Sequence, residues 1–230
     1  MAWAVASVFV VESVIVALAA LPAVVFWAWH FSIPLASPWL RIVLLAMSFV
    51  PAYVVFAIAL ILFSTAATRL LGWRTPRDAT LRIADYAWPL LDWGRYLIIT
   101  HVVRLFVGTV FRVTPLWTLF LRLNGARIGR GVFVNSLGLM DHNLLEFGDG
   151  VVVGSDAHLS GHTVERGVVR TARVRVGAHV VIGIGSVVGI GVEIGDRTQV
   201  GALSVVPKFA TLAAGAVYAG APVRRIDTPG

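Results

Sequence analysis

The chain has 230 residues, of which 58% are hydrophobic and 13% charged, and it contains no cysteine. Soluble domains average about 45–50% apolar and about 25% charged residues, so we expect part of this chain in lipid. The lack of cysteine excludes disulfides, thiolate zinc sites and cysteine nucleophiles. The net charge of +7 is concentrated in residues 69–124, which hold eight arginines and three aspartates. A basic segment directly after an apolar one fits an anionic membrane surface, and we expect no nucleic acid partner.

Two long apolar segments open the chain. Residues 2–29 contain one formal charge, Glu12, and residues 42–68 contain none. Each segment exceeds the roughly 20 residues that a helix needs to span a bilayer, and residues 30–38 between them have the character of a turn. A cleaved signal peptide is not expected, because a basic n-region is missing and a second span follows at once. We therefore predict a transmembrane helical hairpin over residues 1–72.

The charges around the second span predict the orientation. Four arginines follow this span, namely Arg69, Arg74, Arg77 and Arg82. The positive-inside rule then places both ends of the hairpin and everything C-terminal in the cytoplasm. The sequence predicts a multi-pass protein of the cell (inner or plasma) membrane. Two roles remain for Glu12: a contact to a proton or substrate, or a polar tether between helices or subunits.

Residues 73–124 are aromatic and apolar but are interrupted by basic side chains. His101, Arg104 and Arg112 fall on one helical face if the segment is a single helix. We expect one or two amphipathic helices that lie in the membrane interface. A third span is the alternative, in which arginines near the middle would be costly.

From Gly125 onward the sequence has a six-residue period. Aliphatic or aromatic residues recur every six positions, followed in many cases by glycine: Ile128, Val134, Met140, Phe147, Val153, Leu159, Val176, Ile182, Val188, Ile194, Val200 and Val206. One residue slips between Met140 and Phe147. Such a period predicts a solenoid in which each hexad is a short strand plus a corner, and three hexads make one triangular coil. We count eleven or twelve turns, or roughly four coils, in a domain of residues 125–230.

The stretch "RVRVGAHVVIGIGSVVGIGVEIGDRTQVGALSVV" and the ending "YAGAPVRRI" resemble the hexapeptide-repeat acyltransferases. This resemblance implies a left-handed parallel β-helix and an all-β C-terminal domain. "NGARIGRGVFV", "LLEFGDG" and "LSGHTVERGVV" are more similar to the membrane-embedded C-terminal region of ε-poly-lysine-type synthetases. Colanic-acid-type O-acetyltransferases are more distant relatives. Active sites of the family lie between neighbouring β-helices, which implies a homotrimer for a chain with one copy.

The loop "LSGHTVERG" interrupts the hexads, and the resemblance implies that its His162 is the general base. Histidine suits this role because its ordinary pKa lies near 6.5. A carboxylate would fix its tautomer, and Glu165 or Asp156 are the predicted candidates. His142 is expected to line the same cleft, because the two histidines follow anchors on the same edge of adjacent coils.

The resemblance also implies the donor, which is acetyl-CoA or another acyl thioester carried by CoA or a carrier protein. Backbone groups at Gly183 and Ala202 and the basic side chains of Lys208 and Arg224 are the predicted donor-binding positions. No metal is expected.

The predicted function is a membrane-bound acyltransferase of the hexapeptide-repeat class, which acts on a hydroxyl or amine of a membrane lipid or another membrane-associated acceptor. An amide-bond-forming domain of a peptide-synthetase-like system and a non-catalytic trimeric membrane scaffold are the alternatives. A γ-type carbonic anhydrase is disfavoured, since His158 and His162 lack the spacing typical of its metal ligands.

Overall fold

The structure, a computed structural model, describes residues 2–35 and 37–226, and it describes side chains from residue 6 onward. The chain divides into two compact units, Met1–Leu71 and Gly72–Gly230. Residues 73–124, which the sequence analysis separates from the repeats, thus belong to the same unit as the repeats.

The first unit consists of two long helices, α1 (Ala2–Ser32) and α2 (Pro38–Leu70). They contact each other, and the indole Nε1–H of Trp27 donates a hydrogen bond to Ser48 Oγ over 2.9 Å. Most of their large apolar side chains are exposed, as lipid-facing side chains would be. Both helices are long and apolar enough to cross a membrane. One carboxylate oxygen of Glu12 is buried without a hydrogen-bond partner among the described residues.

The second unit begins with short elements and a third long helix. β1 (Thr80–Arg82) and a 3-10 turn, η1 (Ile83–Asp85), precede α3 (Trp88–Val103). A π-helical turn, η2 (Arg104–Gly108), joins α3 to α4 (Thr109–Phe111). The resulting 24-residue helix, Trp88–Phe111, is also long and apolar enough to span a membrane. Its end at Phe111 corrects the prediction that Arg112 shares a helical face with His101 and Arg104.

The short helix α5 (Pro115–Leu123) joins the long helix to the repeats and caps their first coil. It contacts β2 and β3, and it buries Trp117, Phe120 and Leu121. Its apolar residues lie on one side, as expected for a helix that covers the open end of a solenoid. The helix α5 is therefore packed on the first coil.

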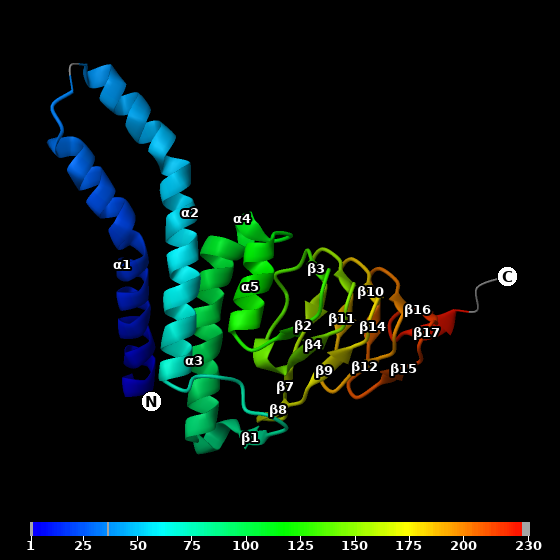
Figure 1. Cartoon of the computed structure of the whole chain (residues 1–230). Coiled ribbons are helices and arrows are strands. Elements are labelled where there is room, and N and C mark those ends of the chain that lie inside the picture. Colours follow the sequence, from blue (N-terminus) through cyan, green and yellow to red (C-terminus); the bar gives the residue numbers. More distant parts are fainter. Residues whose placement is uncertain (1, 36, 227–230) are drawn as a thin grey trace. The chain divides into compact units, whose positions relative to one another are not determined.

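The repeats form a parallel β-helix with three faces (Figure 1). One face stacks β2 (Arg127–Ile128), β4 (Leu145–Phe147), β9 (Val174–Val176), β12 (Glu193–Ile194) and β15 (Thr211–Leu212). The second stacks β3 (Phe133–Val134), β5 (Val152–Val153), β10 (Val181–Ile182), β13 (Gln199–Val200) and β16 (Val217–Ala219), with antiparallel β17 (Arg224–Ile226) at its edge. The third stacks β6 (His158–Leu159), β11 (Val187–Val188) and β14 (Val205–Val206), with the bridge Leu139–Leu159 before β6.

The repeat period predicts the core well, with two corrections. Val153, Leu159, Ile182 and Val188 are each 0% exposed, as their inward positions require. Two of the three faces carry five parallel strands in the described chain, so the prediction of about four coils was too low. Leu139, which is 1% exposed, occupies the inward position that we predicted for Met140. The predicted left hand of the coil stays a prediction.

The loop that breaks the repeat is a β-hairpin. β7 (His162–Glu165) pairs antiparallel with β8 (Val168–Thr171), and β8 pairs antiparallel with β1. Phe147 and Val176 are therefore neighbours on one face although 29 positions separate them, whereas 18 separate Ile194 from Leu212. The β7–β8 hairpin leaves the β-helix after Ser160 and returns at Ala172. Through the β1–β8 pairing, the hairpin attaches β1, which precedes the third long helix, to the first coils.

Candidate active site

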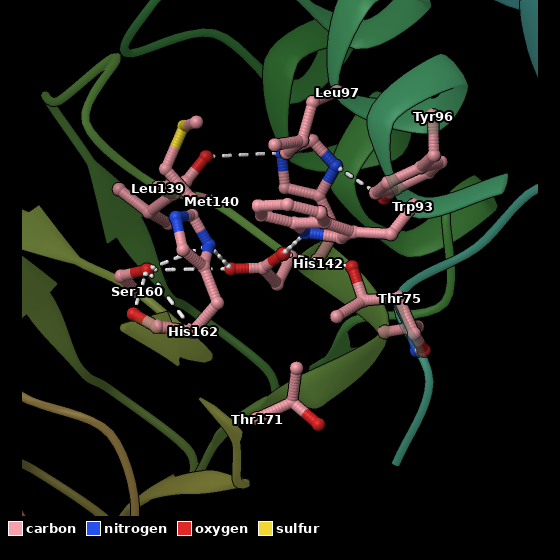
Figure 2. Close-up of polar contacts among 12 residues, drawn as sticks. Thr75, Trp93, Tyr96, Leu97, Leu139, Met140, His142, Ser160, His162 and Thr171 are labelled. Carbon is pink, nitrogen blue, oxygen red and sulfur yellow. Dashed lines mark hydrogen bonds and ion pairs between the residues drawn. The ribbon is translucent and has the colours of Figure 1, made fainter. Parts of the chain in front are cut away.

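His162 is the first residue of β7 and is held by a buried carboxylate. Its Nδ1 lies 2.5 Å from Oδ2 of Asp141 (Figure 2). The side chain of Asp141 is 0% exposed, whereas that of His162 is 18% exposed. The pair therefore consists of a fully buried carboxylate and an imidazole that reaches the surface.

The stacking of two coils brings these residues together. Leu139 and Leu159 form a parallel bridge, and the N–H of Met140 donates to the carbonyl of Leu159 over 2.9 Å. The chain leaves both anchors at the same corner, so Asp141 and His162 emerge side by side. Asp141 lies in the left-handed region, with φ 58°, just before the 3-10 turn η3 (His142–Leu144). Aspartate tolerates this conformation better than most residues do.

Three further side chains donate hydrogen bonds to Asp141. Thr75 Oγ1 and Trp93 Nε1 donate to Oδ1 over 2.7 and 3.0 Å, and Ser160 Oγ donates to Oδ2 over 3.3 Å. Burial acts to raise the pKa of Asp141, but the hydrogen bonds from His162, Thr75 and Trp93 and the attraction of the imidazole outweigh it. The pKa of Asp141 is therefore lowered below its ordinary value. Asp141 is an ionised hydrogen-bond acceptor at neutral pH.

This environment determines which nitrogen of His162 carries the proton. A carboxylate can only accept, so Nδ1–H donates to Asp141 and the lone pair lies on Nε2. Among the described residues, Nε2 has no recorded hydrogen-bond partner. The indole of Trp93 packs edge-on against the imidazole, with 4.9 Å between the ring centres. The ring is thus oriented on one side, and its basic nitrogen is free to meet a hydroxyl or amine.

His142 lies on the same edge as predicted, but it is buried, with both nitrogens occupied. Nε2 lies 3.1 Å from the carbonyl of Leu139, and Nδ1 lies 2.9 Å from the hydroxyl of Tyr96. Nε2–H therefore donates to the carbonyl, and Nδ1 accepts from the tyrosine. Burial lowers the pKa of His142 to about 4. At neutral pH it is an uncharged link between α3 and the first coil.

Glu165 and Lys208 are brought together by the fold. The ammonium of Lys208, which follows β14, forms an ion pair with the carboxylate of Glu165 near the tip of the β7–β8 hairpin. Arg170 of the same hairpin lies over the ring of Phe209, with 5.6 Å to its centre. The carboxylate next to His162 is that of Asp141, whereas Glu165 and the exposed Asp156 have other contacts.

The remaining predicted residues lie in the late coils. Gly183 approaches the next coil so closely that a Cβ there would lie 2.4 Å from the backbone nitrogen of Ala202. The two predicted backbone positions are therefore adjacent. Arg224 begins β17 and is exposed, and it pairs in register with Ala219. The predicted donor-binding residues therefore lie apart. Lys208 pairs with Glu165, Gly183 stacks on Ala202, and Arg224 lies on the last strand.

Asp141, Thr75 and Trp93 were not predicted from the sequence. Asp141 precedes His142 by one position and lies on the same edge of the coils, so the hexad count was a signal for it. Thr75 and Trp93 gave no comparable signal, because they lie 66 and 48 positions before Asp141. Within residues 2–35 and 37–226, no three His, Asp or Glu side chains are grouped in a way that could hold a metal ion.

The solved structures to which the chain is similar include acetyltransferases. A hexapeptide-repeat-containing acetyltransferase from Vibrio cholerae is 23% identical over 46% of this chain and 63% of its own, with a TM-score of 0.41. A serine acetyltransferase from Brucella abortus strain S19 in complex with coenzyme A is 18% identical over 76% of this chain and 56% of its own, with a TM-score of 0.43. A maltose O-acetyltransferase from Clostridium difficile 630 is 22% identical over 55% of this chain and 82% of its own, with a TM-score of 0.40.

The chain spans 63% or less of the Vibrio and Brucella proteins. No family model matches the chain, and no curated protein matches it significantly. The closer resemblance to ε-poly-lysine-type synthetases stays a prediction. At these identities and TM-scores, the inference about function depends on the geometry of the site.

Proposed function

We propose that this protein is a membrane-bound acyltransferase that moves an acyl group from a thioester donor to a hydroxyl or amine of a membrane-associated acceptor. The observation that carries the proposal is the His162–Asp141 pair, with a buried ionised carboxylate on Nδ1 and an unbonded Nε2. An oriented imidazole with an accessible Nε2 at the surface of a protein is what general base catalysis requires.

In the proposed reaction, Nε2 of His162 removes the proton from the acceptor hydroxyl or amine as that group attacks the thioester carbonyl. The new C–O or C–N bond forms first and gives a tetrahedral intermediate. The C–S bond then breaks, and the imidazolium returns its proton to the departing thiolate. Asp141 stabilises the imidazolium between the two transfers and keeps the ring in the productive tautomer.

The membrane segments support a membrane-borne acceptor. Trp93, which packs against His162, belongs to the helix Trp88–Phe111, which by length and composition could cross a bilayer. A base held by such a helix can act on a group at the membrane surface, while a soluble thioester approaches from the aqueous side. We propose the cytoplasmic face of the cell membrane for this site, in keeping with the arginines that follow the second span.

The proposed donor is acetyl-CoA or a carrier-bound acyl thioester. Gly183 and Ala202 lie at a close approach of two coils and are the proposed backbone contacts of the donor arm. Lys208 and Arg224 are the proposed phosphate contacts, and Glu165 would exchange its ion pair with Lys208 when the donor binds. His142 is proposed to support the site from the core. A homotrimer would bring the late coils of one subunit beside the hairpin of the next.

The test is incubation of detergent-purified protein with acetyl-CoA and a membrane lipid extract, with free CoA and acylated products followed by mass spectrometry. We expect product from the wild type and a loss of about 10²- to 10⁴-fold in rate for His162→Ala, because the base is removed. The matched control is His179→Ala, since His179 is an exposed histidine of a regular coil.

Each other outcome has a definite meaning. Equal rates for wild type and His162→Ala would keep the transferase and remove the histidine from its role. No product together with no CoA binding would contradict a CoA donor and favour the carrier-dependent or scaffold alternatives.

A further inference from the structure

A concave site lies between the segment that opens the second unit and the first turn of α3, and its lining residue Thr75 bonds to Asp141. This pocket of about 420 Å³ is lined by Arg74, Pro76, Arg77, Pro89 and Asp92, among others. We call it the arginine pocket. Its polar side chains are of the kind that bind anions, and neither the proposed transfer mechanism nor the core uses its two arginines.

Arg74 and Arg77 give the arginine pocket a positive charge that no ion pair within residues 6–35 and 37–226 compensates. Arg74 and Arg77 are both exposed and have no ion pair among the described residues. The carboxylate of Asp92 is already paired with Arg95 over 2.9 Å. Arg95 is itself buried over the rings of Trp73 and Trp88, with 5.3 and 5.6 Å to the ring centres. The two guanidiniums are therefore available to an anion, and a phosphate matches the forked donors of arginine.

The wall that carries both arginines is fixed to the β-helix. The backbone carbonyl of Thr75 accepts a hydrogen bond from Asn143 Nδ2 over 2.8 Å. Thr171 Oγ1 donates to the carbonyl of Pro76 over 2.7 Å and accepts from the N–H of Ala79 over 3.0 Å. A binding wall that is ordered before the ligand arrives loses little entropy when the ligand binds.

The same two segments also hold the proposed catalytic pair. Thr75, between the two arginines, donates to Asp141. Trp93, directly after Asp92 of the pocket, donates to the same carboxylate oxygen and packs against His162 (Figure 2). The arginine pocket is thus built from residues that contact the catalytic pair, or that directly precede one that does. Thr75 lines the pocket, and Trp93 follows its Asp92. This arrangement fits an acceptor whose anionic group and whose reacting hydroxyl or amine are parts of one molecule.

The position in the chain points to a membrane-borne anion. Gly72 and Arg74 follow directly after α2, which ends at Leu70, and Pro89 belongs to the first turn of the third long apolar helix. Residues that directly follow a membrane-spanning segment lie at the level of the lipid phosphates. The exposed Trp88 and Tyr86 near the pocket are the residue types that prefer this interface.

From these contacts we infer that the arginine pocket binds the phosphate of a lipid-linked acceptor and so selects the substrate of this enzyme. The inference depends on the proposed function for the fate of the acceptor, but the binding site itself does not depend on catalysis. Arg74 and Arg77 contact the phosphate, and the group to be acylated extends from it toward Nε2 of His162.

The experiment is calorimetric titration of detergent-solubilised full-length protein with farnesyl phosphate, a soluble prenyl phosphate, and with farnesol as the uncharged probe. We expect the wild type to bind farnesyl phosphate and not farnesol. The Arg74→Gln/Arg77→Gln double variant is expected to lose about tenfold or more in affinity, because two charge-assisted contacts are removed. The Arg74→Lys/Arg77→Lys variant should recover part of this loss, since the charges return without the forked donors.

Two controls separate this proposal from the transferase proposal and from a folding defect. Arg130→Gln removes another exposed arginine of the second unit and should leave binding unchanged. His162→Ala should abolish transfer and keep full binding of farnesyl phosphate. Equal affinity of the wild type and the Arg74→Gln/Arg77→Gln variant would overturn the arginine pocket. Inorganic phosphate that binds as tightly as farnesyl phosphate would overturn the assignment to a lipid.

Discussion

The early and the late coils of the β-helix follow the same six-residue rule but use their buried polar side chains differently. In the late coils, Ser186 Oγ donates to the carbonyl of Gly201, and Thr198 Oγ1 donates to that of Ala213, both over 2.8 Å. In the early coils, Asp141 and His142 bond to side chains of β7 and α3. The late coils thus satisfy these polar groups within the repeat. In the early coils Ser136 does the same, whereas Asp141 and His142 hold elements from outside the regular hexads.

The reason for this difference is the cost of an unpaired polar group in the core. A buried hydroxyl that bonds to the adjacent carbonyl stabilises the coil and does nothing else. A buried carboxylate needs several donors, and the partly exposed imidazole, Ser160 and the segments around Thr75 and Trp93 supply them. The comparison predicts that late-coil changes affect stability, whereas early-coil changes affect activity and its pH dependence.

The largest expected effect is on the stability of the late coils. Ile182→Ala removes a side chain that is 0% exposed and leaves a cavity, so we expect a loss of about 2–5 kcal/mol in the free energy of unfolding. The adjacent Val181 points outward and is 39% exposed, and Val181→Ala should cost about 0.5 kcal/mol. Denaturant titration of the β-sheet circular dichroism signal measures both. Equal costs would contradict the inward and outward pattern.

The next effect is on activity in the early coils. Asp141→Asn removes the negative charge that stabilises the imidazolium and presents an amide where four donors converge. We expect the transfer rate to fall by about 10²-fold, or about 2.7 kcal/mol in activation free energy. The control is Asp196→Asn, because Asp196 accepts a hydrogen bond from the N–H of Ala178 at a late corner. An undiminished rate for Asp141→Asn would remove Asp141 from the mechanism.

The smallest effect concerns pH and His142. Its pKa is lowered from 6.5 to about 4 in the folded protein, so the unfolded chain binds more protons between these values. The stabilisation is therefore complete above about pH 6.5 and is lost as the pH falls toward 4, by about 2 kcal/mol at pH 5. His142→Gln keeps an acceptor for Tyr96 and a donor for Leu139, so the variant should lose less stability on acidification.

Thermal unfolding of both proteins at pH 7.5 and pH 5 checks this prediction. Val188→Ala, a late-coil core variant, should lower the midpoint temperature of unfolding at both pH values. The difference between its two midpoints should equal that of the wild type. An identical pH dependence of wild type and His142→Gln would show that His142 is not the group that titrates.

The sequence predicted the repeated core because each inward residue follows from its own hexad, with its neighbours 18 positions away. Ile182 and Ile194 needed no knowledge of the rest of the chain. His162 was named from a resemblance, and the edge on which it meets His142 followed from counting hexads. The count failed at Leu139 and Met140, where the slip of one residue changed which side chain points inward.

The amino-acid sequence by itself determined the long apolar helices, the solenoid and the position of the hairpin that interrupts it, because local periodicity and hydropathy decide these features. Only the tertiary structure decided which carboxylate holds His162. A buried charge is tolerated where donors from distant segments converge, and that convergence depends on how the segment around Thr75, α3 and the first coils pack together. The arginine pocket has the same origin, since Arg74 and Asp92 become neighbours only when those segments are assembled.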